Sequence, residues 1–328
     1  MTGTIGGGAP ACTDWARGQR LDPIGTAGYY QGFVLVEQPL PWPADVAQIP
    51  ELSGVARLAA QADMRFQAIV GAESASDGLA ERPAGERRVI CYRPAPSTSA
   101  PGVGGGPLSR SELVAPVSGL TDAVAGLLAS PTPAAKVDAG PEGGSEPEVD
   151  VLVCTHGRRD ICCGGRGMDL VAELVEQPVM SATARVRLWR TSHTGGHRFA
   201  PTCIVLPAAT LWAWADASLV VNAVTGTGPV EGVVSRYRGC ACLGTPAHQA
   251  VERAVLAEVG WPLLATARRA WDAGEGRVVL ETDVAGTWEA VVHEGRCVPQ
   301  PECRTDPAMA TKFGVEWVVE GLRQVVVV

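Results

Sequence analysis

The sequence predicts a mixed α/β fold, and two patterns in it carry that prediction. In residues 148–226, short apolar runs with the alternation of strands occur between stretches whose apolar residues recur at helical spacing. Residues 1–95 contain the same mixture, whereas residues 271–328 contain only strand-like runs separated by turn signals. Apolar residues make up 46% and charged residues 19% of the 328 residues, which is the composition of a globular protein rather than a disordered one.

The best-defined unit lies in residues 148–270. An apolar strand over residues 149–153 ends at Cys154, and a loop over residues 155–167 then leads to a helix that Pro178 ends. The predicted elements that follow are strands at 185–188, 203–206 and 210–214, a helix at 217–224, and helical residues at 246–270. The order β-α-β-β-β-α up to residue 226 is compatible with a thioredoxin-like sheet.

Three flanking regions complete the predicted organisation. An N-terminal mixed α/β domain (1–95) has strands at 30–37, 66–70 and 88–92 and a helix marked by Leu52, Val55, Ala59 and Ala62. A linker rich in Pro, Gly and Ser (96–147) has one helical pattern at 111–128, which Pro116, Gly119 and Gly126 weaken. A small β-rich C-terminal region (271–328) has strand-like runs at 278–282, 288–293, 315–319 and 325–328. We find no internal repeat in the sequence.

The net charge and the absence of targeting signals exclude several classes of partner and location. The net charge of −8 argues against nucleic acid or an anionic membrane surface as a partner, because both bind basic patches. The first residues lack the basic and apolar segments of a secretory signal, and no apolar run reaches the roughly 20 residues of a membrane span. We therefore expect a cytoplasmic protein, in which the ten cysteines act as ligands, reactive thiols or buried apolar groups rather than disulfides.

Two motifs carry the chemistry. The first runs from Cys154 to Cys163, and the second is His193-Thr-Gly-Gly-His197. Thiolates and imidazoles together are the ligands of zinc, copper and iron–sulfur centres. The two glycines between the histidines disfavour a helix, so we expect a loop that presents both imidazoles to one point. Glycines at 157, 164, 165 and 167 would similarly allow a bound group to approach the backbone closely.

The residues alone leave three functions open. The first is electron transfer by an iron–sulfur protein, and the second is a zinc protein that uses the same two cysteines and two histidines. The third is a thiol-dependent oxidoreductase in which Cys163, close to a helix start and to Arg158 and Arg159, is the nucleophile.

The two motifs resemble those of the sucrase/ferredoxin-like family, a branch of the thioredoxin-like [2Fe-2S] ferredoxins. The resemblance rests on the Cys154–Cys163 spacing and on the histidine motif with its continuation Arg-Phe-Ala-Pro. Weaker similarity at residues 22–27, 35–42 and 236–239 extends it to about residue 265. The family implies a thioredoxin-like ferredoxin domain with a [2Fe-2S] cluster, whose matching ligands here are Cys154, Cys163, His193 and His197.

This resemblance implies an electron carrier rather than a stand-alone enzyme. Histidine ligation raises the reduction potential above that of an all-cysteine ferredoxin, and a solvent-reachable N–H on each imidazole would couple electron transfer to a proton. The chain has no nucleotide-binding fingerprint, so we expect a separate redox partner protein, either a reductase or an electron acceptor. We identify no pair of carboxylates placed for glycoside hydrolysis, so the residues do not support a sucrase activity.

The remaining cysteines and histidines receive structural assignments. Cys162 adjoins a predicted ligand, but the family spacing selects Cys163. We expect His156 to be a supporting or exposed residue, and Cys203 to be a buried thiol on a strand. The spacing of the last four cysteines matches no common zinc motif, so we expect no second metal site among Cys240, Cys242, Cys297 and Cys303.

Overall fold

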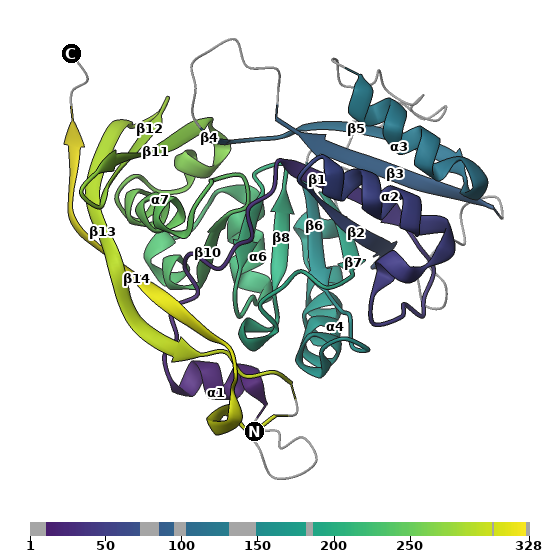
Figure 1. Cartoon of the computed structure of the whole chain (residues 1–328), viewed down its shortest axis with the longest axis horizontal. Coiled ribbons are helices and arrows are strands. Elements are labelled where there is room, and N and C mark those ends of the chain that lie inside the picture. Colours follow the sequence, from purple (N-terminus) through teal and green to yellow (C-terminus); the bar gives the residue numbers. More distant parts are fainter. Residues whose placement is uncertain are drawn as a thin grey trace.

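The computed structural model describes residues 11–72, 85–94, 103–130, 149–181, 186–303 and 305–325. Within these residues it contains a nine-stranded mixed sheet and a five-stranded antiparallel sheet, flanked by helices (Figure 1). The predicted α/β fold is therefore confirmed. No helix in the described residues combines the length and the apolar character that a membrane crossing requires.

The large sheet contains strands from both halves of the chain. Across the sheet its strands are β10 (Tyr237–Cys240), β9 (Thr210–Trp212), β8 (Cys203–Leu206), β6 (Val149–Cys154), β7 (Val186–Thr191), β2 (Met64–Gly71), β1 (Gly32–Glu37), β3 (Glu86–Arg93) and β5 (Ser109–Pro116). The small sheet contains β14 (Phe313–Val325), β13 (Gly286–Pro299), β12 (Arg277–Thr282), β11 (Arg268–Gly274) and β4 (Val103–Gly105). The α-helices are α1 (Cys12–Gly18), α2 (Pro50–Gln61), α3 (Leu120–Ala129), α4 (Ile161–Val175), α5 (Pro178–Ser181), α6 (Ala217–Thr225) and α7 (Pro246–Val259).

The predicted β-α-β-β-β-α unit forms from β6, α4, β7, β8, β9 and α6, with the short α5 as an addition. Strand β6 pairs in parallel with β7 and antiparallel with β8, and β9 pairs antiparallel with β8. Parallel strands need a crossover between them, and α4 supplies it. Strand β6 is thus an inner, fully paired strand, and its last residue, Cys154, is completely buried.

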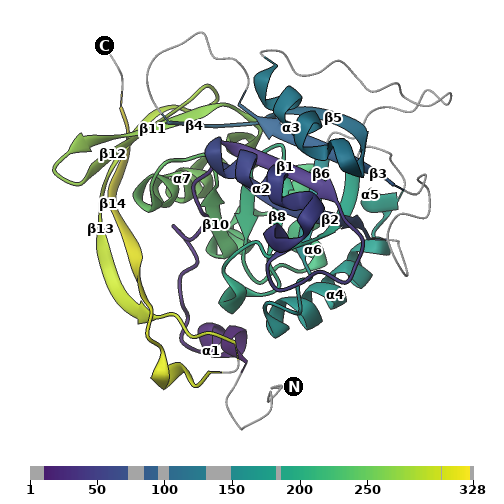
Figure 2. The same ribbon diagram turned by 45° about the vertical axis from the view of Figure 1, so that its right-hand side comes forward.

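The first part of the chain repeats this arrangement, although its sequence does not reveal the repeat. Strands β1, β2, β3 and β5 with helices α2 and α3 follow the same order and the same strand directions. Helices α2 and α3 lie side by side over a shared core with β1 and β3 (Figure 2). Both first strands end at equivalent positions, Glu37 in β1 and Cys154 in β6. The two units therefore share a topology, but only the second has a thiol at this strand end.

The two units join edge to edge through β2 and β7, which pair antiparallel. Ile69 lies opposite Glu37 in the first unit, and Thr191 lies opposite Cys154 in the second. These two equivalent residues, Ile69 and Thr191, pair with each other, as a local two-fold relation between the units requires. Strands from residues 1–95 and 148–270 thus form one continuous sheet, while the domain boundaries themselves stay a prediction.

Some predicted elements begin or end elsewhere. The predicted helix at 111–128 is instead β5 followed by α3, because residues 109–116 pair with β3 along their whole length. Helix α4 begins at Ile161, inside the predicted loop. The predicted helical stretch at 246–270 ends at Val259, and its last residues form a 3-10 turn and the start of β11. Parts of the predicted linker (95–102 and 131–148) and residues 326–328 lie outside the described residues.

Candidate metal centre

Cys154 and Cys163 lie against each other where β6 ends and α4 begins. Both are buried, Cys163 being only 1% exposed. The Cys163 thiol donates a hydrogen bond to the Cys154 sulfur, and this lowers the pKa of Cys154 to about 6, against the opposing effect of burial. Hydrogen bonds from the backbone of His156 and Thr194 add to the effect. The same hydrogen bond and burial raise the pKa of Cys163, so the thiolate of this pair is on Cys154.

The glycines around this pair allow backbone to approach backbone. A Cβ at Gly167 would lie 2.0 Å from the carbonyl oxygen of Cys154, and one at Gly164 would lie 2.5 Å from the Cα of Gly157. Helix α4 therefore packs directly onto the residues that follow β6. We expected these glycines to allow a bound group to approach the backbone. In the structure, Gly157, Gly164 and Gly167 allow helix α4 to approach it.

A substitution at Gly167 should disturb this packing. We expect Gly167→Ala to lower the free energy of unfolding by about 1–3 kcal/mol, because a carbonyl of the buried strand stands where the methyl group must go. Gly165→Ala is the matched control: the site is exposed, nothing lies within 4 Å, and alanine favours helix by about 1 kcal/mol. Urea denaturation of both variants measures the difference. Equal stability of the two variants would contradict the packing argument.

The histidine motif forms the loop that follows β7. Thr191, the last residue of β7, lies directly opposite Cys154. The amide of Thr155 donates a hydrogen bond to the carbonyl of Thr191 at 3.1 Å. The two motifs therefore leave the same edge of the sheet at the same level. Gly195 and Gly196 have φ angles of +80° and +72°, a backbone region that glycine adopts without steric cost.

Arg238 fixes the shape of this loop. The guanidinium is buried and donates to the carbonyl of Gly195 at 3.0 Å and to the Oγ1 and carbonyl of Thr26 at 3.0 and 2.6 Å. A Cβ at Gly196 would lie 2.6 Å from its Nη2. Residues 22–27 and 236–239, which carried part of the resemblance, thus support the histidine loop.

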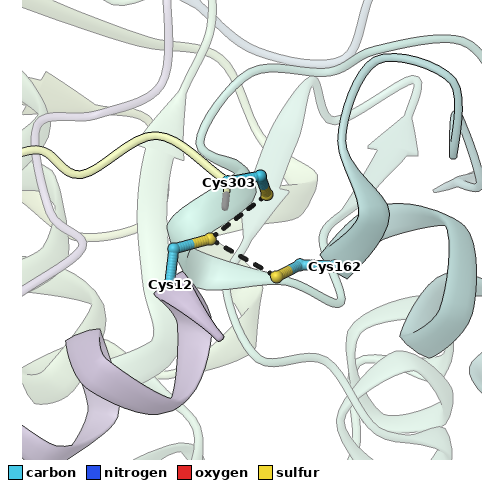
Figure 3. Close-up of side chains that lie close together, drawn as sticks. All are labelled: Cys12, Cys162 and Cys303. Carbon is cyan, nitrogen blue, oxygen red and sulfur yellow. Dashed lines mark hydrogen bonds between the residues drawn. The ribbon is translucent and has the colours of Figure 1, made fainter. Parts of the chain in front are cut away.

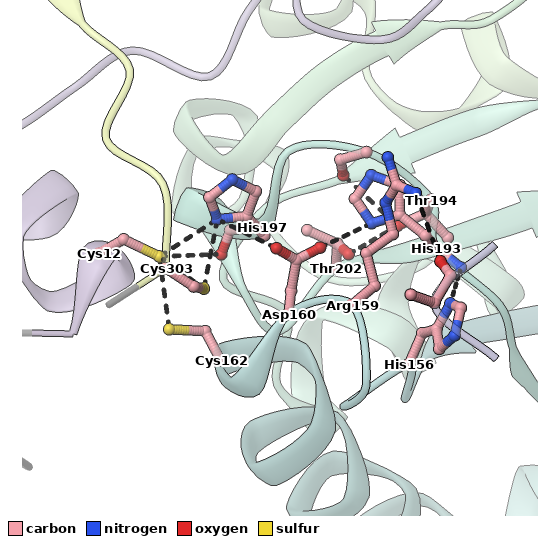
Figure 4. Close-up of polar contacts among 12 residues, drawn as sticks. Cys12, His156, Arg159, Asp160, Cys162, His193, Thr194, His197, Thr202 and Cys303 are labelled. Atoms are coloured by element: carbon pink, nitrogen blue, oxygen red, sulfur yellow. Dashed lines mark hydrogen bonds and ion pairs between the residues drawn. The ribbon is translucent and has the colours of Figure 1, made fainter. Parts of the chain in front are cut away.

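Asp160 lies between the two histidines (Figure 4). Its Oδ2 is 2.8 Å from Nδ1 of His193, and its Oδ1 is 3.8 Å from Nδ1 of His197. Burial would raise the pKa of Asp160, but the hydrogen bond to His193 and the charge of His197 lower it overall. The carboxylate therefore stays ionised. Asp160 is the N-cap residue of α4, and both imidazoles face its carboxylate.

His156 supports His193 from the other side. The backbone N–H of His193 donates to Nδ1 of His156 at 3.2 Å, so Nε2 carries the proton and donates to the carbonyl of Pro43 at 2.8 Å. Its ring packs edge-on against Trp42, with the centroids 5.8 Å apart. Burial lowers the pKa of His156, which keeps the ring neutral. Both ring nitrogens are thus engaged, and His156 supports the loop.

The four predicted ligands therefore form two pairs at one sheet edge, the thiol pair and the imidazole pair bridged by Asp160. Within the described residues, two groups of at least three ligating side chains have all their ligand atoms within 4.8 Å of one another. They are Cys12, Cys162 and Cys303, and Asp160, His197 and Cys303. These groups could hold a metal ion. Binding of a metal by the four predicted ligands together stays a prediction.

Cys12, Cys162 and Cys303 were not among the predicted ligands. Figure 3 shows their thiols converging, with the Cys12 sulfur 3.4 Å from each of the other two. Hydrogen bonds from Cys12 and Cys303 lower the pKa of Cys162 to about 2. Only the adjacency of Cys162 to a predicted ligand hinted at this group, because Cys12 and Cys303 are separated by 291 positions in the chain.

The other cysteines take structural positions. Cys203 lies fully buried on β8, where burial raises its pKa to about 12. Cys240 and Cys242 are buried next to each other, with the amide of Cys242 donating to the Cys240 sulfur at 3.4 Å. Cys297 is exposed on β13. Of the four late cysteines, Cys303 belongs to the two groups of ligating side chains, one with Cys12 and Cys162 and the other with Asp160 and His197.

Comparison with known proteins agrees with this arrangement. The family model described as sucrase/ferredoxin-like matches residues 23–239, which include both motifs and the residues that support the histidine loop. The match leaves out Cys12 and Cys303. No curated protein and no solved structure matches the chain. Because the matched segment covers well over half of its residues, this protein belongs to the sucrase/ferredoxin-like family.

Proposed function

We propose that this protein transfers electrons by means of a [2Fe-2S] cluster bound to Cys154, Cys163, His193 and His197. The observation that supports this most directly is that the thiol pair, where β6 ends and α4 begins, and the imidazole pair, in the loop after β7, lie at one edge of the sheet. When bound, such a cluster accepts and releases single electrons. The family membership supports the same ligand set.

The donor set suits the cluster. The cysteine and histidine ligands must be thiolates and neutral imidazoles, and the low pKa of Cys154 and the lowered pKa of the half-buried His197 favour those forms. The buried Arg238 contributes positive charge to the surroundings of Cys154 and Cys163. Two thiolates and two neutral imidazoles would bring the oxidised core to about zero net charge.

Asp160 determines which nitrogen of His193 is available. Its carboxylate lies 2.8 Å from Nδ1, so it would favour a proton on Nδ1 and leave Nε2 for iron. A carboxylate in this position fixes the ring orientation and makes the imidazole a stronger donor. The Nδ1 proton of His193 would then face the Asp160 carboxylate during electron transfer rather than an open path to solvent.

Electrons would enter and leave on the histidine side. The cysteine sulfurs are buried, whereas the side chains of His193 and His197 are 23% and 18% exposed. A cavity of about 340 Å³ opens beside His193, with Arg65 and Arg159 in its wall. We propose that a separate redox partner protein places acidic groups against these arginines.

Two alternatives use the same residues. A thiol enzyme with Cys163 as its nucleophile fits less well, because the Cys163 thiol is 1% exposed and its hydrogen bond to Cys154 raises its pKa. A zinc ion on the same two cysteines and two histidines would satisfy the donors, but it would carry no electrons.

Absorption spectroscopy of the purified protein separates these functions. We expect a red-brown protein with two iron and two sulfide ions per chain, whose visible bands bleach on reduction by dithionite. A colourless protein that contains zinc at these four ligands would overturn the proposal. So would a metal-free protein with an alkylation-sensitive Cys163.

A further inference from the structure

A second group of ligands lies next to the proposed cluster site but shares no sulfur with it. The Cys12 sulfur is 3.4 Å from those of Cys162 and Cys303 and 3.3 Å from Nδ1 of His197. The Cys303 sulfur is 3.5 Å from the same nitrogen. The three sulfurs lie within 4.8 Å of one another, and the imidazole nitrogen adjoins two of them, those of Cys12 and Cys303.

Helical geometry explains how adjacent cysteines serve two groups. Cys162 and Cys163 are the second and third residues of α4, and successive side chains on an α-helix point about 100° apart. Cys163 therefore faces Cys154 at the end of β6, while Cys162 faces Cys12 in α1.

The other two thiols come from the ends of the chain. Cys12 is the first residue of α1, and Cys303 lies between the long strands β13 and β14. In both overall views, α1 and the segment that links these strands lie side by side (Figures 1 and 2). The hairpin also contacts the N-terminal segment through Glu316, whose Oε1 accepts from the amide of Asp22 at 2.9 Å.

We propose that Cys12, Cys162, Cys303 and Nδ1 of His197 bind a single zinc ion, which shares His197 but no sulfur with the proposed cluster. Zinc prefers four tetrahedral thiolate and imidazole ligands, and bonds of about 2.3 Å to sulfur place neighbouring sulfurs about 3.8 Å apart. A tetrahedral sulfur–nitrogen edge is about 3.5 Å. The three separations from the Cys12 sulfur and the one between Cys303 and His197 are close to these values, and all four donors are of the types that zinc selects. Zinc binding would draw the Cys162 sulfur and the imidazole nitrogen closer together.

The site is closed, which is typical of structural zinc. Cys12 and Cys162 are each 3% exposed, and the protein supplies all four ligands, leaving no position for substrate. Three thiolates and Zn²⁺ leave one net negative charge, and Arg166 and Arg198 contribute positive charge to Cys162 and Cys12. Binding displaces any remaining thiol protons to the buffer and involves no oxidation or reduction.

The zinc ion would attach both ends of the chain to the cluster loop. It would tie α1 and the β13–β14 hairpin to α4 and hold His197 in place through Nδ1. For Nε2 to bind iron as well, the ring would lose its remaining N–H proton to the buffer and bridge the two metals as an imidazolate. Cys12 and Cys303 lie outside the matched segment 23–239. Two of the four proposed zinc ligands thus lie outside the segment that the family model matches.

Element-specific measurements on the intact protein test this inference. We expect close to one zinc per chain, and zinc K-edge absorption should show three sulfur neighbours at about 2.3 Å and one nitrogen at about 2.0–2.1 Å. Cys12→Ser and Cys303→Ser should each lose zinc by at least tenfold and keep their iron and sulfide. Cys297→Ser, which removes an exposed thiol of the same hairpin, should keep both metals.

Other outcomes would overturn the inference. Retention of zinc with three sulfur neighbours in Cys12→Ser or Cys303→Ser would place the ion elsewhere. A disulfide between Cys12 and Cys303, found by mass spectrometry of unreduced protein, would exclude the zinc site.

If the serine variants do not fold, Cys303→His provides a second test. This variant should keep zinc and change the neighbours of the ion to two sulfurs and two nitrogens; an unchanged three-sulfur shell would contradict the assignment. Absence of iron with zinc retained would reject only the proposed cluster.

Discussion

Replacing Cys163 by serine should remove the iron and the visible absorbance of the protein, whereas replacing its neighbour Cys162 should leave both. The reason is geometric: Cys163 faces Cys154, while Cys162 faces Cys12 and Cys303. A [2Fe-2S] cluster that loses one of its two thiolates is not retained through purification, so we expect at least a tenfold fall in bound iron.

Iron, acid-labile sulfide and absorbance of the two purified variants decide this. The zinc content should change in the opposite sense, falling in Cys162→Ser and staying constant in Cys163→Ser. A cluster that survives in Cys163→Ser and disappears in Cys162→Ser would show that the cluster uses Cys162. That result would also remove Cys162 from the zinc site.

Replacing Arg268 by alanine should lower the free energy of unfolding by about 3–5 kcal/mol, because it leaves a buried carboxylate without its cation. Arg268 on β11 forms an ion pair with Glu252 on α7, and both side chains are 0% exposed. Glu252 also accepts hydrogen bonds from the Tyr237 hydroxyl and from the amide of Cys240, each at 3.0 Å. The pair thus links the small sheet to the end of the large one.

The neighbouring residue provides the matched control. Arg269 pairs with Glu281, but those side chains are 31% and 41% exposed. Solvent screening limits such a pair to about 0–1 kcal/mol, so Arg269→Ala should cost no more than this. Urea denaturation of both variants measures the difference. A loss of less than about 1 kcal/mol for Arg268→Ala would mean that Glu252 takes up a proton or reaches water in the variant.

Local sequence patterns predicted most strands and the ends of several helices. Strand β8 occupies the predicted residues 203–206, and α6 begins at the predicted Ala217. The helix predicted at 111–128 was wrong in its first part, because an apolar run can form either element and residues 109–116 pair with β3 as a strand; its second part is helix α3. The sequence did not reveal that the two units share a topology, because a fold constrains strand order and burial more than it constrains residue identity.

The sequence by itself determined the α/β class, the family, and two motifs rich in ligands, because periodicity, residue chemistry and short spacings are local properties of the chain. It also indicated that the Gly-Gly segment could not continue a helix.

Only the tertiary structure decided which side chains meet. The Asp160 bridge between the histidines and the support from Arg238 and His156 depend on contacts between elements that are distant in the chain. The convergence of Cys12, Cys162 and Cys303 spans nearly the whole molecule, and it arises because one hairpin returns to the first helix. The spacing of residues along the sequence does not indicate that two distant segments pack against each other.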